Sequence, residues 1–331
     1  MLRKYKGLII ALVSVLITII TIVILCFTLF TVQDIKLDYR TELTASYSDE
    51  EIIEKSGMKK GSCVFFLKKQ IYVDNIEKNF PYLEVINIET EIPSHIVIHL
   101  AERREFYAVA YNGQILYCDD EFKVLKIEDG VNYDSTPQNA IFIPENQLKF
   151  DNESIETGDF LQITKKGNGI QQLYNSMLVN ARTYAHMIST IKEISVYDYK
   201  QYDVIVDGKR VEKDYQTSLK LTMHSGREIY LWNIEYGLKY KVQNMYSILS
   251  SVMEIQKFKL ENDLGEEVVY DKETASDHAE INNILANCEI HLKNYQSEYQ
   301  FDERTNSFVK VYGEKDCFYE LVYNGKSLKK A

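Results

Sequence analysis

The clearest pattern in the chain is an uninterrupted apolar run near its beginning. No charged residue occurs from 7 to 32, where Ile, Leu, Val, Thr and Phe dominate. A helix of about 20 apolar residues crosses the roughly 30 Å hydrocarbon core of a bilayer. A cleavable signal sequence would have a shorter apolar core ending at a small-residue site, but no Ala occurs between Ala11 and Ala45. The pattern predicts an uncleaved transmembrane helix over 7–32.

The charges on either side of this run predict its orientation. Arg3, Lys4 and Lys6 precede it without any acid, whereas acidic and basic residues are mixed from Asp34 to Glu42. Because an excess of basic residues stays on the cytoplasmic side, we expect 1–6 to be a cytoplasmic tail. The sequence therefore predicts a single-pass protein of the cell membrane with most of the chain outside the cytoplasm.

A second pattern alternates short strands with amphipathic helices. Ser48 and Glu51 form a capping box, a typical helix start, and Gly57 is a typical stop. Apolar and polar residues alternate on both sides of the helical part, as in half-buried strands. The predicted elements are a strand at 35–39, a helix from 48 to 57, a helix at 67–78, and strands at 85–89 and 95–100.

This β-α-α-β-β order resembles the POTRA domain of the FtsQ and DivIB cell-division proteins. The resemblance is carried by Ser48-Asp49-Glu50-Glu51-Ile52-Ile53, Gly57 and Gly61, Phe80-Pro81, Val85 to Ile88, Ile92-Pro93 and Glu102-Arg103. It implies a POTRA domain over 34–103.

Hairpin signals follow residue 104. Asn112-Gly113 separates the apolar runs 107–111 and 114–118, and this dipeptide favours a type I′ turn. A second hairpin is predicted from Ser218 to Trp232, and a helix from Leu238 to Met253. These elements are similar to the β-domain that follows POTRA in the same family. The fold class is therefore predicted as α+β, with a mixed β-rich domain with helices over 104–331.

The last part of the chain, from about 256, diverges from the family pattern. We expect an acidic loop over 261–280, a helix at 281–292, and a hairpin that pairs 308–312 with 317–323. An open sheet edge in that hairpin would invite a strand from a partner. The candidate partner-binding residues are Phe318, Tyr319, Leu321 and Tyr323.

Composition narrows the classes of function. The chain has 331 residues, 45% hydrophobic and 26% charged, which is typical of a folded protein. Its net charge of −11 argues against nucleic-acid binding. The 25 tyrosines could stack on sugars or fill interfaces, but they are spread along the chain as β-sheet propensity alone would spread them.

Catalytic motifs lack their partners. The S-x-x-K pattern occurs at Ser56, Ser189, Ser307 and Ser327, but neither S-D-N nor K-T-G accompanies it. The adjacent acids Asp119-Asp120 and Glu266-Glu267 are interpreted as solvated loop residues rather than as a glycosidase pair. No catalytic residue is assigned, and we expect a protein that is not an enzyme.

Metal and cofactor sites are not predicted either. His95 and His99 share a strand face but lie about 13 Å apart at 3.3 Å per residue, and Cys288 with His291 would supply only two ligands. Of the cysteines, Cys63, Cys118, Cys288 and Cys317 would lie outside the membrane. Disulfides among them stay open, since spacing does not give connectivity.

The resemblance implies a divisome scaffold of the FtsQ/DivIB type. Its partners would be FtsL-like and DivIC/FtsB-like bitopic proteins, which would help assemble septal cell-wall synthesis by the peptidoglycan synthase at the division septum. Two alternatives are a membrane-anchored extracytoplasmic POTRA adaptor or sensor outside cell division and, less favoured, a cell-wall enzyme.

Overall fold

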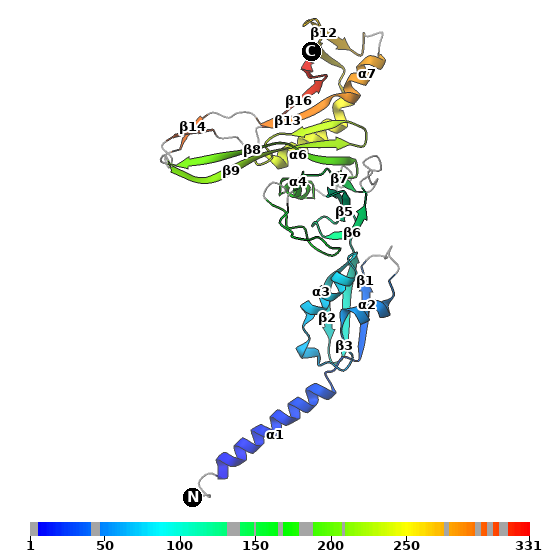
Figure 1. Ribbon diagram of the computed structural model, residues 1–331, viewed down its shortest axis with the longest axis vertical. Helices are drawn as coiled ribbons and strands as arrows, with labels where there is room; N and C mark the ends of the chain where they lie inside the picture. The colour runs from blue at the N-terminus through cyan, green and yellow to red at the C-terminus, as the bar shows by residue number, and fades with distance from the viewer. Residues whose placement is uncertain are drawn as a thin grey trace. The chain divides into compact units, whose positions relative to one another are not determined.

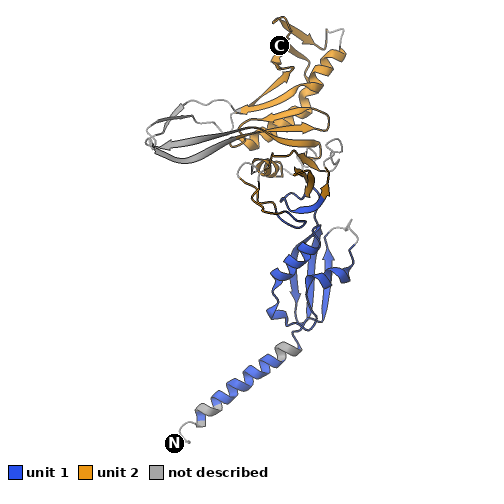
Figure 2. Ribbon diagram, viewed as in Figure 1, with its two compact units in different colours: residues 1–105, 118–127, 155–160 blue, residues 106–117, 128–154, 161–331 orange. Residues whose placement is uncertain are grey.

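A computed structural model describes most of the chain (Figure 1). The described residues are 6–40, 47–130, 140–148, 150–164, 168–178, 188–206, 209–274, 278–294, 299–302, 307–310 and 317–331. They form two compact units, shown in Figure 2. Unit 1 comprises 1–105, 118–127 and 155–160, and unit 2 comprises 106–117, 128–154 and 161–331.

Helix α1 (Lys6–Thr28) occupies the segment where a membrane anchor was expected. Its described side chains, at residue 7 and from 11 to 24, are exposed. Among the residues that the structure describes, no helix is both long and apolar enough to cross a membrane. This finding contradicts the predicted transmembrane helix at 7–32 and the single-pass membrane placement that rested on it.

The rest of unit 1 begins with the predicted β-α-α-β-β order. Its elements are β1 (Asp34–Tyr39), α2 (Asp49–Ser56), the 3-10 turn η2 (Val64–Phe66), α3 (Lys69–Asn79), β2 (Leu83–Glu91) and β3 (His95–Glu102). The sheet order is β1-β3-β2, in which β1 runs parallel to β3 and β2 runs antiparallel to it. This arrangement confirms the order of elements predicted from the sequence.

The predicted helix signals form the ends of α2. The Ser48 hydroxyl accepts a hydrogen bond from the Glu51 amide at 3.2 Å, so it satisfies a donor that the helix start leaves unpaired. Gly57 ends the helix at φ 75°, a left-handed conformation that favours glycine, and its N–H donates to the Glu54 carbonyl.

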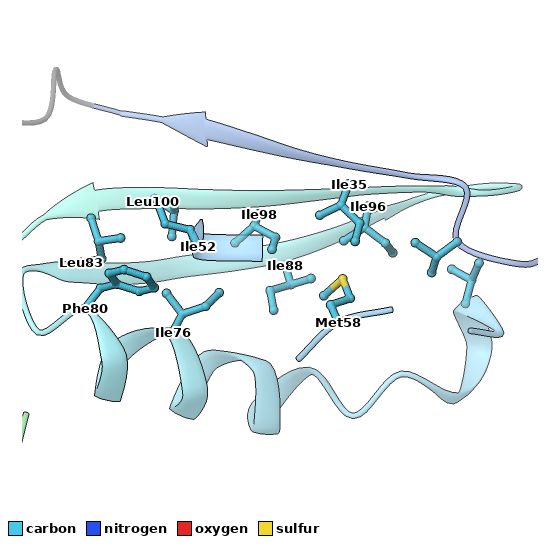
Figure 3. Close-up of a cluster of buried hydrophobic side chains, with 12 residues drawn as sticks. Ile35, Ile52, Met58, Ile76, Phe80, Leu83, Ile88, Ile96, Ile98 and Leu100 are labelled. Carbon is cyan, nitrogen blue, oxygen red and sulfur yellow. The ribbon is translucent and has the colours of Figure 1, made fainter. Parts of the chain in front are cut away.

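The core of unit 1 lies between the sheet and its two helices (Figure 3). Ile96, Ile98 and Leu100 alternate along β3 and are fully buried. Ile52 of α2 and Ile76 of α3 cover them from the helical layer. Each such side chain contributes about 1.5–3 kcal/mol by leaving water, which explains why the period-2 strands and the short helices form one unit.

Unit 1 continues beyond the predicted end of the POTRA domain at 103. Residues 118–127 and 155–160 belong to the same compact unit, although they are separate in sequence. The Val124 amide and carbonyl bond to Asp159 and Gly158 respectively, so the two segments hold each other. The boundaries predicted at 103 and 104 stay predictions.

A ten-stranded sheet contains most strands of unit 2, in the order β17-β16-β13-β10-β9-β8-β7-β4-β5-β6. Its bounds are β4 (Tyr107–Tyr111), β5 (Gln114–Cys118), β6 (Val124–Asp129), β7 (Ile141–Ile143), β8 (Ile191–Val206), β9 (Lys209–Met223), β10 (Glu228–Leu231), β13 (Glu289–Asn294), β16 (Cys317–Tyr323) and β17 (Lys326–Ser327). Asn112 and Gly113 both have positive φ, as the predicted type I′ turn requires.

Helices and smaller sheets complete unit 2. The helices are α4 (Asn168–Leu178), α6 (Leu238–Ser251), the 3-10 turn η3 (Val252–Glu254) and α7 (His278–Asn287). A sheet in the order β12-β11-β18 contains β11 (Lys257–Glu261), β12 (Glu267–Asp271) and β18 (Lys329–Lys330), while β14 (Tyr299–Asp302) pairs with β15 (Ser307–Lys310).

Three local predictions for the last part of the chain are wrong. The region 261–280 contains strand β12 rather than only a loop, and the helix expected at 281–292 ends at Asn287. Strand β13 then takes Ile290 and Leu292 into the sheet, because a strand partner is available on each side. Among the described residues, β15 pairs with β14 while β16 pairs with β13 and β17, so 308–310 are not paired with β16 as predicted. Residues 311–316 of the predicted hairpin lie outside the described residues.

Candidate partner-binding site

Strand β16 has a largely open side in the described part of unit 2. One side pairs along its whole length with β13, from Cys317 opposite Asn294 to Val322 opposite Glu289. On the other side, β17 pairs only with Val322 and Tyr323. On that side the ladder with β17 starts at Val322, so Tyr319 lies outside it.

The backbone direction along this edge follows from one hydrogen bond. The Leu321 carbonyl accepts from the Leu328 amide at 2.8 Å, so the Leu321 carbonyl points away from β13. Because backbone groups of residues i and i+2 point the same way in a strand, the Tyr319 N–H and C=O point outward too. An edge of this kind can accept a further strand through main-chain hydrogen bonds.

Two hollows flank the open edge. The larger one has a volume of about 860 Å³, and the aromatic side chains of Phe258, Phe318 and Tyr319 help to line it together with Leu328 of the β17–β18 connection. The smaller one, about 400 Å³, lies against α6 and includes Asn244 and Ser247. Phe318 and Tyr319 line both hollows, so the edge has side-chain pockets as well as open backbone.

The four residues predicted from the sequence do not play equal parts. Tyr319 is 51% exposed and Phe318 is half-buried at the edge. Leu321 is 5% exposed because it packs opposite Ile290 in the sheet, although it contributes to the larger hollow. Tyr323 lines neither hollow, but it packs against the apolar cluster that includes Phe258. The structure thus brings the first three together at the hollows and places the fourth on the adjoining cluster.

Residues outside the predicted set complete the site. Ile255, Phe258 and Leu328–Lys330 line the larger hollow, and Asn244 donates from α6 to the Cys317 thiol sulfur at 3.0 Å. Sequence reasoning missed them because only the fold brings them to β16. The alternation of Phe258 and Leu260 with charged residues over 257–261 was the available signal, since it indicates a strand that needs a neighbour.

A polar group fixes the strand beside the site. The Glu320 carboxylate accepts from the Lys293 ammonium at 2.5 Å and from the Ser327 hydroxyl, which connects β13, β16 and β17. The hydrogen bond from Lys293 is the main reason why the pKa of Glu320 lies below its ordinary value, and the Ser327 hydrogen bond adds to it. These side-chain contacts hold β13 and β17 to β16 without involving the backbone of the open edge.

The histidines considered as ligands have separate partners. His99 bonds to Asp38 at 2.7 Å and to Glu89 at 3.3 Å on the exposed side of the unit 1 sheet, and the Asp38 bond raises its pKa. His95 lies 4.0 Å from Asp34. In the described part of the chain, no three His, Cys, Asp or Glu side chains are arranged to hold a metal ion.

Cys288 and His291 are not helix neighbours, since α7 ends before both. Cys288 is buried, and Arg227 donates to its sulfur at 3.4 Å and to the Leu285 carbonyl at 2.8 Å. Burial raises the pKa of the Cys288 thiol. The guanidinium is therefore placed to satisfy carbonyls at the end of α7, where a cation is favoured by the helix dipole.

The acids considered as a catalytic pair also have structural partners. Asp119 is 2% exposed and accepts from Arg103 at 2.6 Å, while Glu267 accepts from Lys329 at 2.6 Å. At the first S-x-x-K position, the Ser56 hydroxyl donates to the Ile53 carbonyl and accepts from the Met58 amide. These groups hold turns and ion pairs, whereas Tyr319 on the β16 edge has outward backbone groups and lines both hollows.

Comparison with known proteins shows what part of this chain is similar to. A family model described as POTRA domain, FtsQ-type, matches residues 42–103. The cell division protein DivIB of Clostridium tetani is 31% identical over 91 residues, which are 25% of this chain and 34% of that protein. DivIB of Clostridium acetobutylicum is 29% identical over 83 residues, 25% of this chain and 33% of that protein.

Unit 1 contains a POTRA domain of the FtsQ type, as its β-α-α-β-β order and the match over 42–103 agree. The matched part of the chain is similar to FtsQ/DivIB cell-division proteins. The chain spans about a third of the length of the curated relatives it matches.

Proposed function

We propose that this chain is a cell-division protein that works by binding other proteins. The FtsQ-type POTRA domain and the two DivIB relatives support a role in division. The observation that carries the binding role is the open edge of β16, which offers outward backbone groups between two hollows. A scaffold needs such a surface and no reaction chemistry.

The proposed partners are FtsL-like and DivIC/FtsB-like division proteins, and through them the septal peptidoglycan synthase. An extended segment of one partner would add to β16 and form main-chain hydrogen bonds at Tyr319, while its alternate side chains enter the two hollows. The POTRA domain offers a second surface. Several modest contacts made together raise the effective concentration of each partner, so the assembly is tighter than any single contact.

The role in division is tested in the cells that make this chain. A fluorescent fusion of the full chain is expected to gather at the division site as the septum forms, and FtsL-like and DivIC/FtsB-like proteins are expected among the proteins that co-purify with it. An even distribution throughout the division cycle, together with co-purification of neither protein, would refute the proposal. It would favour an adaptor outside division instead.

A further inference from the structure

The sheet of unit 2 has a row of polar and aromatic side chains across four strands. Tyr230 of β10 is paired with Lys220 of β9 and with His291 of β13, and His291 is paired with Glu320 of β16. Their sequence neighbours Ile229, Leu231, Ile290 and Leu292 are fully buried. Because successive side chains point to opposite faces of a strand, the row lies on the face opposite the apolar core.

His291 is at the centre of this row, and both of its ring nitrogens are engaged. Its ring stacks on Tyr230 with centroids 4.5 Å apart at 20°, and it lies at 23° to the Trp232 ring. The Trp232 Nε1 lies 3.2 Å from His291 Nδ1, and the Glu289 carboxylate lies 2.8 Å from His291 Nε2. The His291 side chain is 13% exposed.

The chemistry of the partners determines which nitrogen carries the proton. An indole N–H can donate but cannot accept a hydrogen bond. His291 Nδ1 must therefore be unprotonated to accept from Trp232, so Nε2 carries the proton and donates to Glu289. This neutral form satisfies both contacts. A doubly protonated ring keeps the bond to Glu289 but turns an N–H toward the Trp232 N–H.

The charged groups around His291 are nearly all paired with each other. On β10 and β9, Glu228 accepts from Lys220 at 2.5 Å and from the Tyr230 hydroxyl at 2.7 Å. On β13 and β16, Lys293 is 2.5 Å from Glu320. The β8 residue Tyr197 adds an uncharged ring, 5.3 Å from Trp232. Glu289 is thus the carboxylate in direct contact with His291.

We propose that His291 is a proton-operated latch that holds Trp232 on this face of the sheet. In the neutral form, Nδ1 accepts the Trp232 N–H and fixes the indole. Protonation by a proton from solvent places two donors against each other, so the hydrogen bond is lost and Trp232 leaves its position, while Glu289 holds the imidazolium. No bond other than the hydrogen bond to Trp232 is broken.

The latch has a direct route to β16. His291 is opposite Glu320, which Lys293 holds, and the Lys293 ammonium also lies over the Trp232 ring at 5.8 Å from its centroid. A charged His291 competes with Lys293 for the Glu320 carboxylate. An effect of the latch on a bound partner rests on the proposed function of the β16 edge. The latch itself does not depend on that function.

The chain contains a single tryptophan, so its intrinsic fluorescence reports on Trp232 alone. When Trp232 leaves its position, its indole becomes more exposed to water, which quenches indole emission. We expect the full-length chain to lose Trp emission as the pH falls from about 8 to about 5, the range in which histidines titrate, with circular dichroism unchanged. His291→Gln keeps an acceptor for the indole but does not titrate, and it should abolish the loss. His99→Gln, which removes a histidine of unit 1, should leave it intact.

A second measurement keeps the latch testable if the variant fails to fold. ¹⁵N NMR of the unaltered chain at about pH 8 should give an unprotonated His291 Nδ1 and a protonated Nε2. Emission that stays constant across the titration, an equal loss of emission in the His291→Gln chain, or a proton on Nδ1 at about pH 8 would each overturn the proposal.

Discussion

At the scale of single residues, buried cations hold the backbone where helices begin and end. Lys241 is fully buried, and its ammonium donates to the carbonyls of Trp232, Asn233 and Tyr236 at 2.5, 2.7 and 2.6 Å. Three carbonyls that connect β10 to α6 are therefore satisfied by one side chain. Burial lowers the pKa of Lys241 to about 8, the mark of a charge kept out of water.

Replacing Lys241 by Met should lower the free energy of unfolding by roughly 1–3 kcal/mol for each carbonyl left buried without a donor. Removing the desolvated charge offsets part of this loss, so the expected net effect is about 2–4 kcal/mol. Urea unfolding measures it. Lys239→Met, an exposed lysine in the same helix turn, should stay within about 0.5 kcal/mol. Equal effects of the two substitutions would show that the three contacts do not matter.

The lowered pKa of Glu320 predicts that the stability of the fold decreases at low pH. Lys293 and the Ser327 hydroxyl lower its pKa in the folded chain below the ordinary value. The ionised carboxylate therefore stabilises the fold above the ordinary glutamate pKa of about 4.3, and this stability is lost as the pH falls through the lower folded value. Thermal unfolding of Glu320→Gln should depend less on pH below about 5 than that of the unaltered chain; parallel curves would contradict this assignment.

At the scale of elements, a buried ion network joins the POTRA domain to a later hairpin. Arg103 at the end of β3 contacts Asp119 at 2.6 Å and Glu77 of α3 at 3.4 Å, and Lys123 contacts the same Glu77 at 2.6 Å. The side chains of Arg103, Asp119 and Lys123 are at most 7% exposed. Their pairing explains why 118–127 belongs to unit 1.

Breaking this network should destabilise unit 1 strongly. Asp119→Ala leaves Arg103 without its 2.6 Å carboxylate in a buried site, which costs about 3–5 kcal/mol. Glu121→Ala removes another acid near Arg103, but that side chain is 64% exposed, so about 0.5 kcal/mol or less is expected. Hydrogen exchange of the amides in β3 and α3 measures both. Similar protection in the two variants would refute the special role of the network.

Among the elements, those determined by a few neighbouring residues could be predicted from the sequence. The capping box at Ser48, the stop at Gly57 and the turn at Asn112-Gly113 were predictable because each acts within a few residues. The helix expected at 281–292 failed because Ile290 and Leu292 fit either period, and only their neighbours β10 and β16 decide for a strand. The same limit applies to the site: Phe318 and Tyr319 could be named, but Leu328 and Phe258 could not.

At the scale of the whole molecule, the proposed role is to gather other proteins. Unit 1 contains the FtsQ-type POTRA domain matched over 42–103. Unit 2 ends in a sheet whose last long strand, β16, keeps an open side between two hollows. The surface proposed for partners is therefore built largely from the last part of the chain, which lies outside the residues matched by the POTRA family model.

The structure also changes which substitution tests this surface. A charge or Pro at the candidate residue Leu321 would damage the core, because Leu321 is buried opposite Ile290. Tyr319 is half exposed, and its N–H points away from β13. Proline at 319 removes an outward donor and is tolerated at strand edges.

The most direct measurement is therefore co-purification of FtsL-like and DivIC/FtsB-like proteins with the full-length chain bearing Tyr319→Pro. The account predicts at least a tenfold loss of partner, equivalent to about 1.4 kcal/mol, with circular dichroism and thermal unfolding unchanged. Tyr246→Ala, a partly exposed tyrosine of α6 that lines neither hollow, should retain the partner. Full retention by a folded Tyr319→Pro chain would contradict strand addition at β16.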